Sequence, residues 1–156
     1  MRWLTKLETF RRFAEDLSKL STCKRAGTGC IIFPFDFSRV YAIGYNGPAR
    51  GRDNDACTGE EGQCGCAHAE GNTIAKLDGI VQHAVMYTLT SPCVYCTNMI
   101  INSGKVDLVI YGKEYRDLRG TGMFAGAGII CIDIKEITDD HVQQWRSARS
   151  RHLGVA

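Results

Sequence analysis

Leucine and phenylalanine residues recur at steps of three and four along the first twenty positions of the chain. They stand at positions 4, 7, 10, 13, 17 and 20, and charged residues occupy many of the positions between them. In a helix, this spacing collects the apolar side chains on one face and leaves the charges on the others. The pattern therefore predicts an amphipathic helix that packs one face against the core.

Two short runs rich in β-branched and aromatic residues follow, at 28–33 and 39–44, on either side of a turn that contains Pro34 and Asp36. Runs of this kind joined by a polar turn predict a β-hairpin. A glycine-rich stretch at 120–128 has no clear period, and no element is predicted there. The rest of the chain predicts helices at 67–77, 94–102 and 138–147, and strands at 84–89, 106–111 and 129–134.

The order of these elements predicts the fold class. A helix and two strands come first, and helices then alternate with strands. The first two strands should form an antiparallel pair, whereas strands joined by helical crossovers run parallel. We therefore expect an α/β sandwich built on a mixed sheet.

Length and composition narrow the picture further. The 156 residues correspond to a single domain over 1–156, and 44% hydrophobic with 23% charged residues indicates a globular protein. A net charge of +2 gives no reason to expect nucleic acid or an anionic membrane as a partner. The N-terminus lacks an apolar signal segment, and no run approaches the roughly 18 apolar residues of a membrane span. We therefore expect a soluble, cytoplasmic protein.

Residues 44–66 differ in character from the rest of the chain. They are rich in glycine, they contain Cys57, Cys64 and Cys66, and they are too long for a simple connector. A loop of this length is usually functional, or is organised by something other than a core. The chain has eight cysteines in all. In a reducing compartment, metal binding explains them better than structural disulfides do.

Two short motifs carry the chemistry. His68 and Glu70 open one predicted helix, and Cys93 and Cys96 open the next. Two thiolates and one imidazole bind zinc and leave its fourth position open for water, as in catalytic sites. Glu70 is then placed to move protons without being a ligand. A lone C-x-x-C also fits a redox pair, but H-x-E followed by P-C-x-x-C is the signature of zinc deaminases.

On these motifs, the chain resembles the cytidine deaminase superfamily and, within it, the deoxycytidylate (dCMP) deaminases. The resemblance runs from about residue 22 to about residue 134. It includes Cys23-x-Arg25, the Gly-Tyr-Asn-Gly-Pro loop at 44–48, and Tyr115 after a strand. It implies a three-layer α-β-α fold with a central mixed sheet of five strands.

The resemblance also implies roles for individual residues. The zinc would be held by His68, Cys93 and Cys96, with Glu70 as the proton shuttle in hydrolysis of dCMP to dUMP and ammonia. The substrate contacts would come from Arg25 at the 5′-phosphate, Asn46 at the sugar, Tyr115 beside the base, and Ala69 and Ser91 at the base edge. Each contact residue has a simpler alternative. Asn46 also suits a turn, Arg25 a solvated surface, and Tyr115 ordinary packing.

Further expectations concern the loop and the assembly. Many dCMP deaminases carry a second, structural zinc, and we expect Cys23, Cys57, Cys64 and Cys66 to form such a site; scattered buried thiols are the alternative. Family members are often hexamers, activated by dCTP and inhibited by dTTP. A homo-oligomer with dCTP or dTTP as effector, accompanied by Mg²⁺, is therefore expected. The product dUMP would supply thymidylate synthesis.

One departure from the family pattern suggests a wider substrate range. Gly71 follows Glu70 where the family usually has a larger side chain. The missing side chain would either widen the pocket for a C5-substituted cytosine or make room for a bulkier neighbour.

Two other functions are alternatives to the nucleotide enzyme. A polynucleotide deaminase would need a basic groove with aromatic stacking. A zinc-stabilised binding module would have no use for Glu70.

Overall fold

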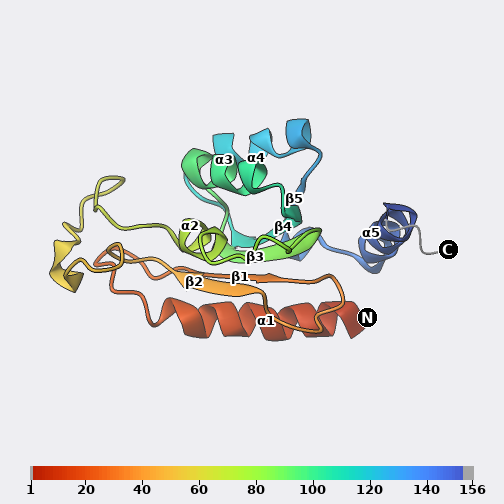
Figure 1. Ribbon diagram of the computed structural model, residues 1–156, viewed down its shortest axis with the longest axis horizontal. Helices are drawn as coiled ribbons and strands as arrows, with labels where there is room; N and C mark the ends of the chain where they lie inside the picture. The colour runs from red at the N-terminus through yellow and green to blue at the C-terminus, as the bar shows by residue number, and fades with distance from the viewer. Residues whose placement is uncertain (1, 153–156) are drawn as a thin grey trace.

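A five-stranded mixed sheet forms the centre of the molecule (Figure 1), in a computed structural model that describes residues 2–152. The strand order is β2-β1-β3-β4-β5. β1 pairs antiparallel with β2 and β3, whereas β3, β4 and β5 run parallel. The strands are β1 (Gly29–Phe33), β2 (Ala42–Tyr45), β3 (Ala84–Thr90), β4 (Val106–Lys113) and β5 (Ile130–Asp133).

Helices cover both faces of the sheet, which confirms the three-layer α-β-α arrangement. α1 (Arg2–Ser18) runs along one face, and α2, α3 and α4 lie on the other (Figure 1). α5 (Asp139–His152) lies near β5, where Val142 and Trp145 join the core cluster that α1 covers. The helices of the opposite layer are α2 (Ala69–Ile74), α3 (Val94–Ser103) and α4 (Arg119–Met123).

Alternate residues of the inner strands supply two separate cores. In β1, Ile31 and Phe33 face α1, whereas Cys30 and Ile32 belong to the cluster beneath α2 and α3. All four side chains are fully buried. Successive side chains of a strand point to opposite faces of the sheet. A strand covered by helices on both sides is therefore apolar at every position, as this run is.

The helix expected over the first twenty residues is present, although its buried face differs from the expected stripe. Leu7 and Leu17 are buried as predicted. Phe13 is 40% exposed, and Leu20 lies past the end of α1 and is 57% exposed. Trp3 and Ala14 are buried in addition. Steps of three drift around a helix of 3.6 residues per turn, so the leucine and phenylalanine positions do not share one narrow face.

Other boundaries also differ from those predicted. The second strand begins at Ala42, later than expected, and in the wider turn before it Phe37 has a positive φ of 60° and packs on Phe33. A helix that the sequence did not predict, α4, occupies part of the glycine-rich stretch. α5 extends beyond the expected end at 147. Among residues 2–152, three 3₁₀ turns complete the set of elements, at Asn54–Ala56, Ala125–Ala127 and Ile134–Glu136.

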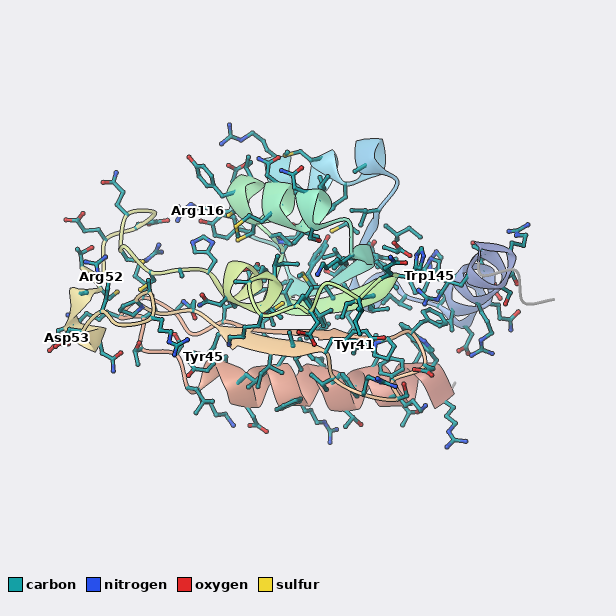
Figure 2. All side chains as sticks on the ribbon, viewed as in Figure 1. Tyr41, Tyr45, Arg52, Asp53, Arg116 and Trp145 are labelled. Carbon is teal, nitrogen blue, oxygen red and sulfur yellow. The ribbon has the colours of Figure 1, made fainter. Side chains whose placement is uncertain are left out.

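The long loop after β2 reaches away from the sheet. Figure 2 shows Arg52 and Asp53 at its far tip. The chain then returns through glycines at 59, 62 and 65, all of which have positive φ. Within residues 2–152, no helix has the length and apolar character needed to cross a bilayer.

Candidate metal centre and active site

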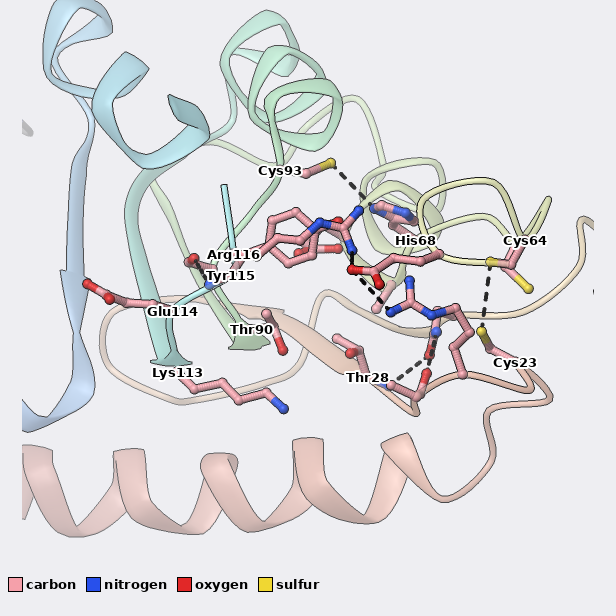
Figure 3. A pocket seen from close by; sticks show the side chains of 18 residues that line it. Cys23, Thr28, Cys64, His68, Thr90, Cys93, Lys113, Glu114, Tyr115 and Arg116 are labelled. Atoms are coloured by element: carbon pink, nitrogen blue, oxygen red, sulfur yellow. Dashed lines mark hydrogen bonds and ion pairs between the residues drawn. The ribbon is translucent and has the colours of Figure 1, made fainter. Parts of the chain in front are cut away.

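The two chemical motifs lie at the N-termini of neighbouring helices. His68 is the N-cap of α2, and Cys93 is the N-cap of α3, with extended backbone torsions at both. Cys96 follows within the first turn of α3. α2 and α3 pack against each other on the same face of the sheet. The imidazole of His68 therefore faces the thiol of Cys93 (Figure 3).

The distances between these side chains fit a zinc site. Nδ1 of His68 lies 3.4 Å from Sγ of Cys93 and 3.5 Å from Sγ of Cys96. Tetrahedral zinc, with bonds of about 2.0 Å to nitrogen and 2.3 Å to sulfur, holds such ligands about 3.5 Å apart. All three ligand atoms lie within 4.8 Å of one another. Within the described part of the chain, this group of candidate ligands stops at three residues.

Hydrogen bonds within this group shift the pKa values of its two thiols in opposite directions. A hydrogen bond from Cys96 and a second one with His68 together lower the pKa of the Cys93 thiol to about 4. The same contact with Cys93 raises the pKa of Cys96. The contact with the Cys93 sulfur raises the pKa of His68. The positive end of the ten-residue helix α3 also favours a thiolate at its N-cap.

Glu70 lies directly behind this group and is 5% exposed. The hydroxyl of Thr88 donates to its Oε1 at 3.4 Å, and the thiol of Cys96 donates to its Oε2 at 3.7 Å. Burial raises the pKa of the Glu70 carboxyl. A carboxyl in this environment exchanges a proton more readily near neutral pH than an exposed one does.

An open pocket of about 370 Å³ leads to these residues (Figure 3). It brings together every residue that the sequence analysis placed at the substrate, from five separate segments of the chain. These residues are Arg25, Asn46, Ala69, Ser91 and Tyr115. The thiols of Cys23, Cys64 and Cys66 also line the pocket.

The side chain of Asn46 stabilises a neighbouring segment, a role beyond the turn position that the sequence suggested. Its Oδ1 accepts hydrogen bonds from the N–H of Thr28 at 2.7 Å and from the hydroxyl of Ser21 at 2.8 Å. Its Nδ2 donates to the carbonyl of Ala26 at 2.7 Å. These bonds fix the segment that carries Arg25. Both lone pairs of Oδ1 are used, so only Nδ2 has a hydrogen left for a ligand.

Ser91, which also lines the pocket, likewise stabilises a neighbouring segment. It is 2% exposed, and its hydroxyl accepts a hydrogen bond from the backbone N–H of Tyr115 at 2.7 Å. The chain that follows β4 is thereby tied to the end of β3. The guanidinium of Arg116 lies 5.1 Å from the centre of the Tyr115 ring. The chain just after β4 thus presents an aromatic ring and a cation to the pocket.

Four further cysteines form a second group beside the pocket. Sγ of Cys23 lies 3.9 Å from that of Cys57 and 4.0 Å from that of Cys64, and the sulfurs of all four, with Cys66, lie within 4.8 Å of one another. Tetrahedral zinc with four sulfur ligands separates them by about 3.8 Å. The backbone N–H of Lys24 lowers the pKa of Cys57 to about 7. The donor set therefore fits one zinc ion.

A model of the cytidine and deoxycytidylate deaminase zinc-binding region matches residues 4–113 of this chain. The chain belongs to this deaminase family. The matched region contains His68, Glu70, Cys93 and Cys96. Family membership and the geometry of the histidine–cysteine cluster both support Zn²⁺ as the cofactor.

Individual relatives agree with this family. Deoxycytidylate deaminase of Saccharomyces cerevisiae is 32% identical over 133 residues, covering 77% of this chain and 42% of its own. That of Schizosaccharomyces pombe is 28% identical over 134 residues, covering 77% and 41%. The chain thus spans less than half the length of these two relatives. The dCMP deaminase of cyanophage S-TIM5, solved with dCMP and dUMP, is 28% identical with a TM-score of 0.74, covering 83% of this chain and 96% of the other.

Pocket residues that the sequence analysis missed come mainly from the end of β4 and from the long loop. They include Lys113, Arg116 and Glu61. None belongs to a recognisable motif. The one available signal was position, because residues just past the carboxyl ends of parallel strands commonly line ligand sites. Glu61 gave no signal, since the path of a long loop is not readable from its composition.

The structure decides between the two consequences considered for Gly71. A Cβ at this position would lie 2.7 Å from Cε of Met99, on α3. Gly71 is also absent from the residues that line the pocket. The missing side chain therefore makes room for Met99 and does not widen the pocket. Gly71 therefore gives no support to the acceptance of a C5-substituted cytosine.

Proposed function

We propose that this chain hydrolyses dCMP to dUMP and ammonia. The observation that carries the proposal is one pocket that joins a three-ligand zinc site, a buried carboxyl and two arginines. The first two suit deamination of a base, and the arginines suit a phosphate. The two yeast relatives and the cyanophage protein described above are named as dCMP deaminases, which supports the same substrate.

In this proposal, His68, Cys93 and Cys96 hold the catalytic zinc. Three protein ligands leave one tetrahedral position open, as catalytic sites require. When bound there, zinc lowers the pKa of water toward about 7 and makes hydroxide available at neutral pH. Glu70 takes a proton from the attacking water and delivers it to the amino group that leaves C4. Its burial beside Cys96 supports this role.

The remaining pocket residues would position the nucleotide. The backbone at Ala69 and Ser91, which line the pocket, would hold the base edge, with Tyr115 packed beside the ring. Asn46 would offer its remaining amide hydrogen to the sugar. Arg25 would bind the 5′-phosphate. Its segment is fixed by three hydrogen bonds with the side chain of Asn46, two accepted by Oδ1 and one donated by Nδ2, which supports a preformed phosphate site.

A substrate panel tests the proposal. Zinc-loaded protein is incubated with dCMP, deoxycytidine, 5-methyl-dCMP and a cytosine-containing single-stranded oligonucleotide, and ammonia release is measured. We expect dCMP to have the highest kcat/KM. Turnover of the oligonucleotide without turnover of dCMP would replace the proposal by polynucleotide deamination. No turnover of any compound would favour a zinc-stabilised binding module.

We also propose that Cys23, Cys57, Cys64 and Cys66 hold a second, structural zinc. The loop at 44–66 carries little apolar surface of its own. Zinc binding by four thiolates would therefore supply the free energy that folds it. Wild-type protein should contain two zinc ions per chain, and Cys57→Ser should contain one and lose thermal stability. Cys131→Ser, which alters a cysteine outside both groups, should keep two. One zinc in the wild type, with reactive loop thiols, would contradict this site.

A homo-oligomer completes the proposal. Tyr95 and Met99 on α3, and Leu118 before α4, are 82%, 42% and 50% exposed, although they are large and apolar. Neighbouring apolar side chains of this kind mark an association surface. We expect an oligomer, with a hexamer favoured, that Tyr95→Glu dissociates in light-scattering measurements. The matched variant Ile80→Glu, at an exposed position between α2 and β3, should leave the mass unchanged, and a monomeric wild type would contradict the proposal.

Nucleotide regulation belongs to the same proposal. The loop at 44–66 contributes Glu61, Cys64 and Cys66 to the pocket, so an effector that moves this loop would alter the site. Activation by dCTP with Mg²⁺ and inhibition by dTTP are the expected responses.

A further inference from the structure

Glu61 connects two arginines that lie far from it in sequence. Nη1 of Arg116 donates a hydrogen bond to its Oε1, and Nη2 of Arg25 lies 3.8 Å from the same oxygen. The three residues come from the long loop, from the chain after β4 and from the segment after α1. One carboxylate oxygen therefore lies where two guanidinium groups converge, and all three residues line the pocket.

Contacts that do not involve Glu61 hold the guanidinium of Arg116 and the backbone segment that carries Arg25. Arg116 lies over the ring of Tyr115, whose backbone is bonded to Ser91. Arg25 lies on the segment that Asn46 fixes. The two cations therefore form a preformed anion site, and Glu61 is its resident occupant. A Cβ at Gly62 would lie 3.0 Å from Nη2 of Arg116, so the loop backbone itself approaches this cation closely.

A phosphate monoester is a stronger ligand for this site than Glu61 is. It carries a charge of about −1.5 to −2 at neutral pH and three acceptor oxygens, against one charge and two oxygens for a carboxylate. Arginine also binds phosphate through paired hydrogen bonds. The side chain of Glu61 is 65% exposed, and ion pairs this exposed are weak. A nucleotide can therefore displace it.

We propose that Glu61 is an internal competitor for the 5′-phosphate, and that Arg116 is the second phosphate-binding arginine beside Arg25. The carboxylate fills the anion site when no nucleotide is bound, and it swings out when the phosphate enters. It thereby raises the KM for monophosphates and leaves the binding of nucleosides unchanged. Weakly bound anions such as inorganic phosphate are kept out. The inference rests on the proposed function, because it assigns the pocket a nucleotide.

Binding of dUMP to zinc-loaded protein, measured by titration calorimetry, tests the inference. Glu61→Gln should tighten dUMP about two- to fivefold, as expected from removing an exposed ion pair that competes with the ligand. Deoxyuridine should bind the variant and the wild type equally. The matched control is Glu60→Gln, since Glu60 forms no ion pair with either arginine within residues 2–152 and should bind dUMP as the wild type does.

A second variant separates competition from a general change in charge. Arg116→Ala should weaken dUMP binding, and adding Glu61→Gln to it should give less than the single-variant gain, because the two side chains share one contact. Weaker or unchanged dUMP binding by Glu61→Gln would overturn the inference, as would an equal effect of Glu60→Gln. Failure of the proposed function gives a different result, namely wild-type protein that does not deaminate dCMP.

Discussion

Replacing Glu70 by glutamine should lower kcat for dCMP by about 10²–10⁴-fold, the range for loss of a general acid–base group. This corresponds to about 2.7–5.4 kcal/mol of transition-state stabilisation. A carboxamide matches the volume of the buried side chain and keeps an acceptor for the Thr88 hydroxyl, but it cannot take up a proton. The KM for dCMP should change much less than kcat.

Metal analysis and a matched variant make this result specific. Glu70→Gln should retain its zinc, because Glu70 is outside the group formed by His68, Cys93 and Cys96. Glu136→Gln makes the same substitution at an exposed position outside the pocket, and its kcat should equal that of the wild type. Full activity in zinc-loaded Glu70→Gln would remove Glu70 from the mechanism.

Removing a ligand should have at least as large an effect through a different cause. Cys96→Ala leaves only His68 and Cys93, and zinc at this site should be lost under dialysis. Even residues that only support a metal ligand are worth about 10–100-fold in affinity or activity, so loss of a ligand should cost more than about 10²-fold. Zinc content per chain should fall by one relative to the wild type, measured on the same samples as activity.

Cys131→Ala serves as the control for this experiment. Cys131 lies in β5, outside both cysteine groups, and is only partly buried. The variant removes a thiol but no ligand, so zinc content and activity should match those of the wild type. If Cys96→Ala kept both, the metal would have to be held elsewhere.

The chemistry at the centre of the pocket was predictable because it depends on residue type and short spacing. His68 and Glu70 are two apart, and Cys93 and Cys96 are three apart, at the starts of helices whose order along the chain is readable. The sheet was predictable for a similar reason, since the apolar runs at 28–33 and 106–111 lie between turn signals. Binding of one zinc ion by His68, Cys93 and Cys96 then requires the starts of the two helices to lie close together.

The rest of the site depends on where distant segments meet, which one sequence does not reveal. Arg116 and Glu61 are ordinary charged residues that gain meaning only from their contact across the pocket. Asn46 satisfied a turn pattern, yet its side chain bonds to three residues of another segment. Helix α4 was missed because glycine hides helical periodicity, and tertiary packing against α3 overrides that weak propensity.

The most direct test of the account is hydrolysis of dCMP by zinc-loaded wild-type protein in water enriched in the heavy isotope of oxygen. Ammonia and dUMP should form in equal amounts, and each dUMP should carry one heavy oxygen at C4, with Glu70→Gln forming neither at a comparable rate. No ammonia from dCMP in protein that contains its full zinc would contradict the account.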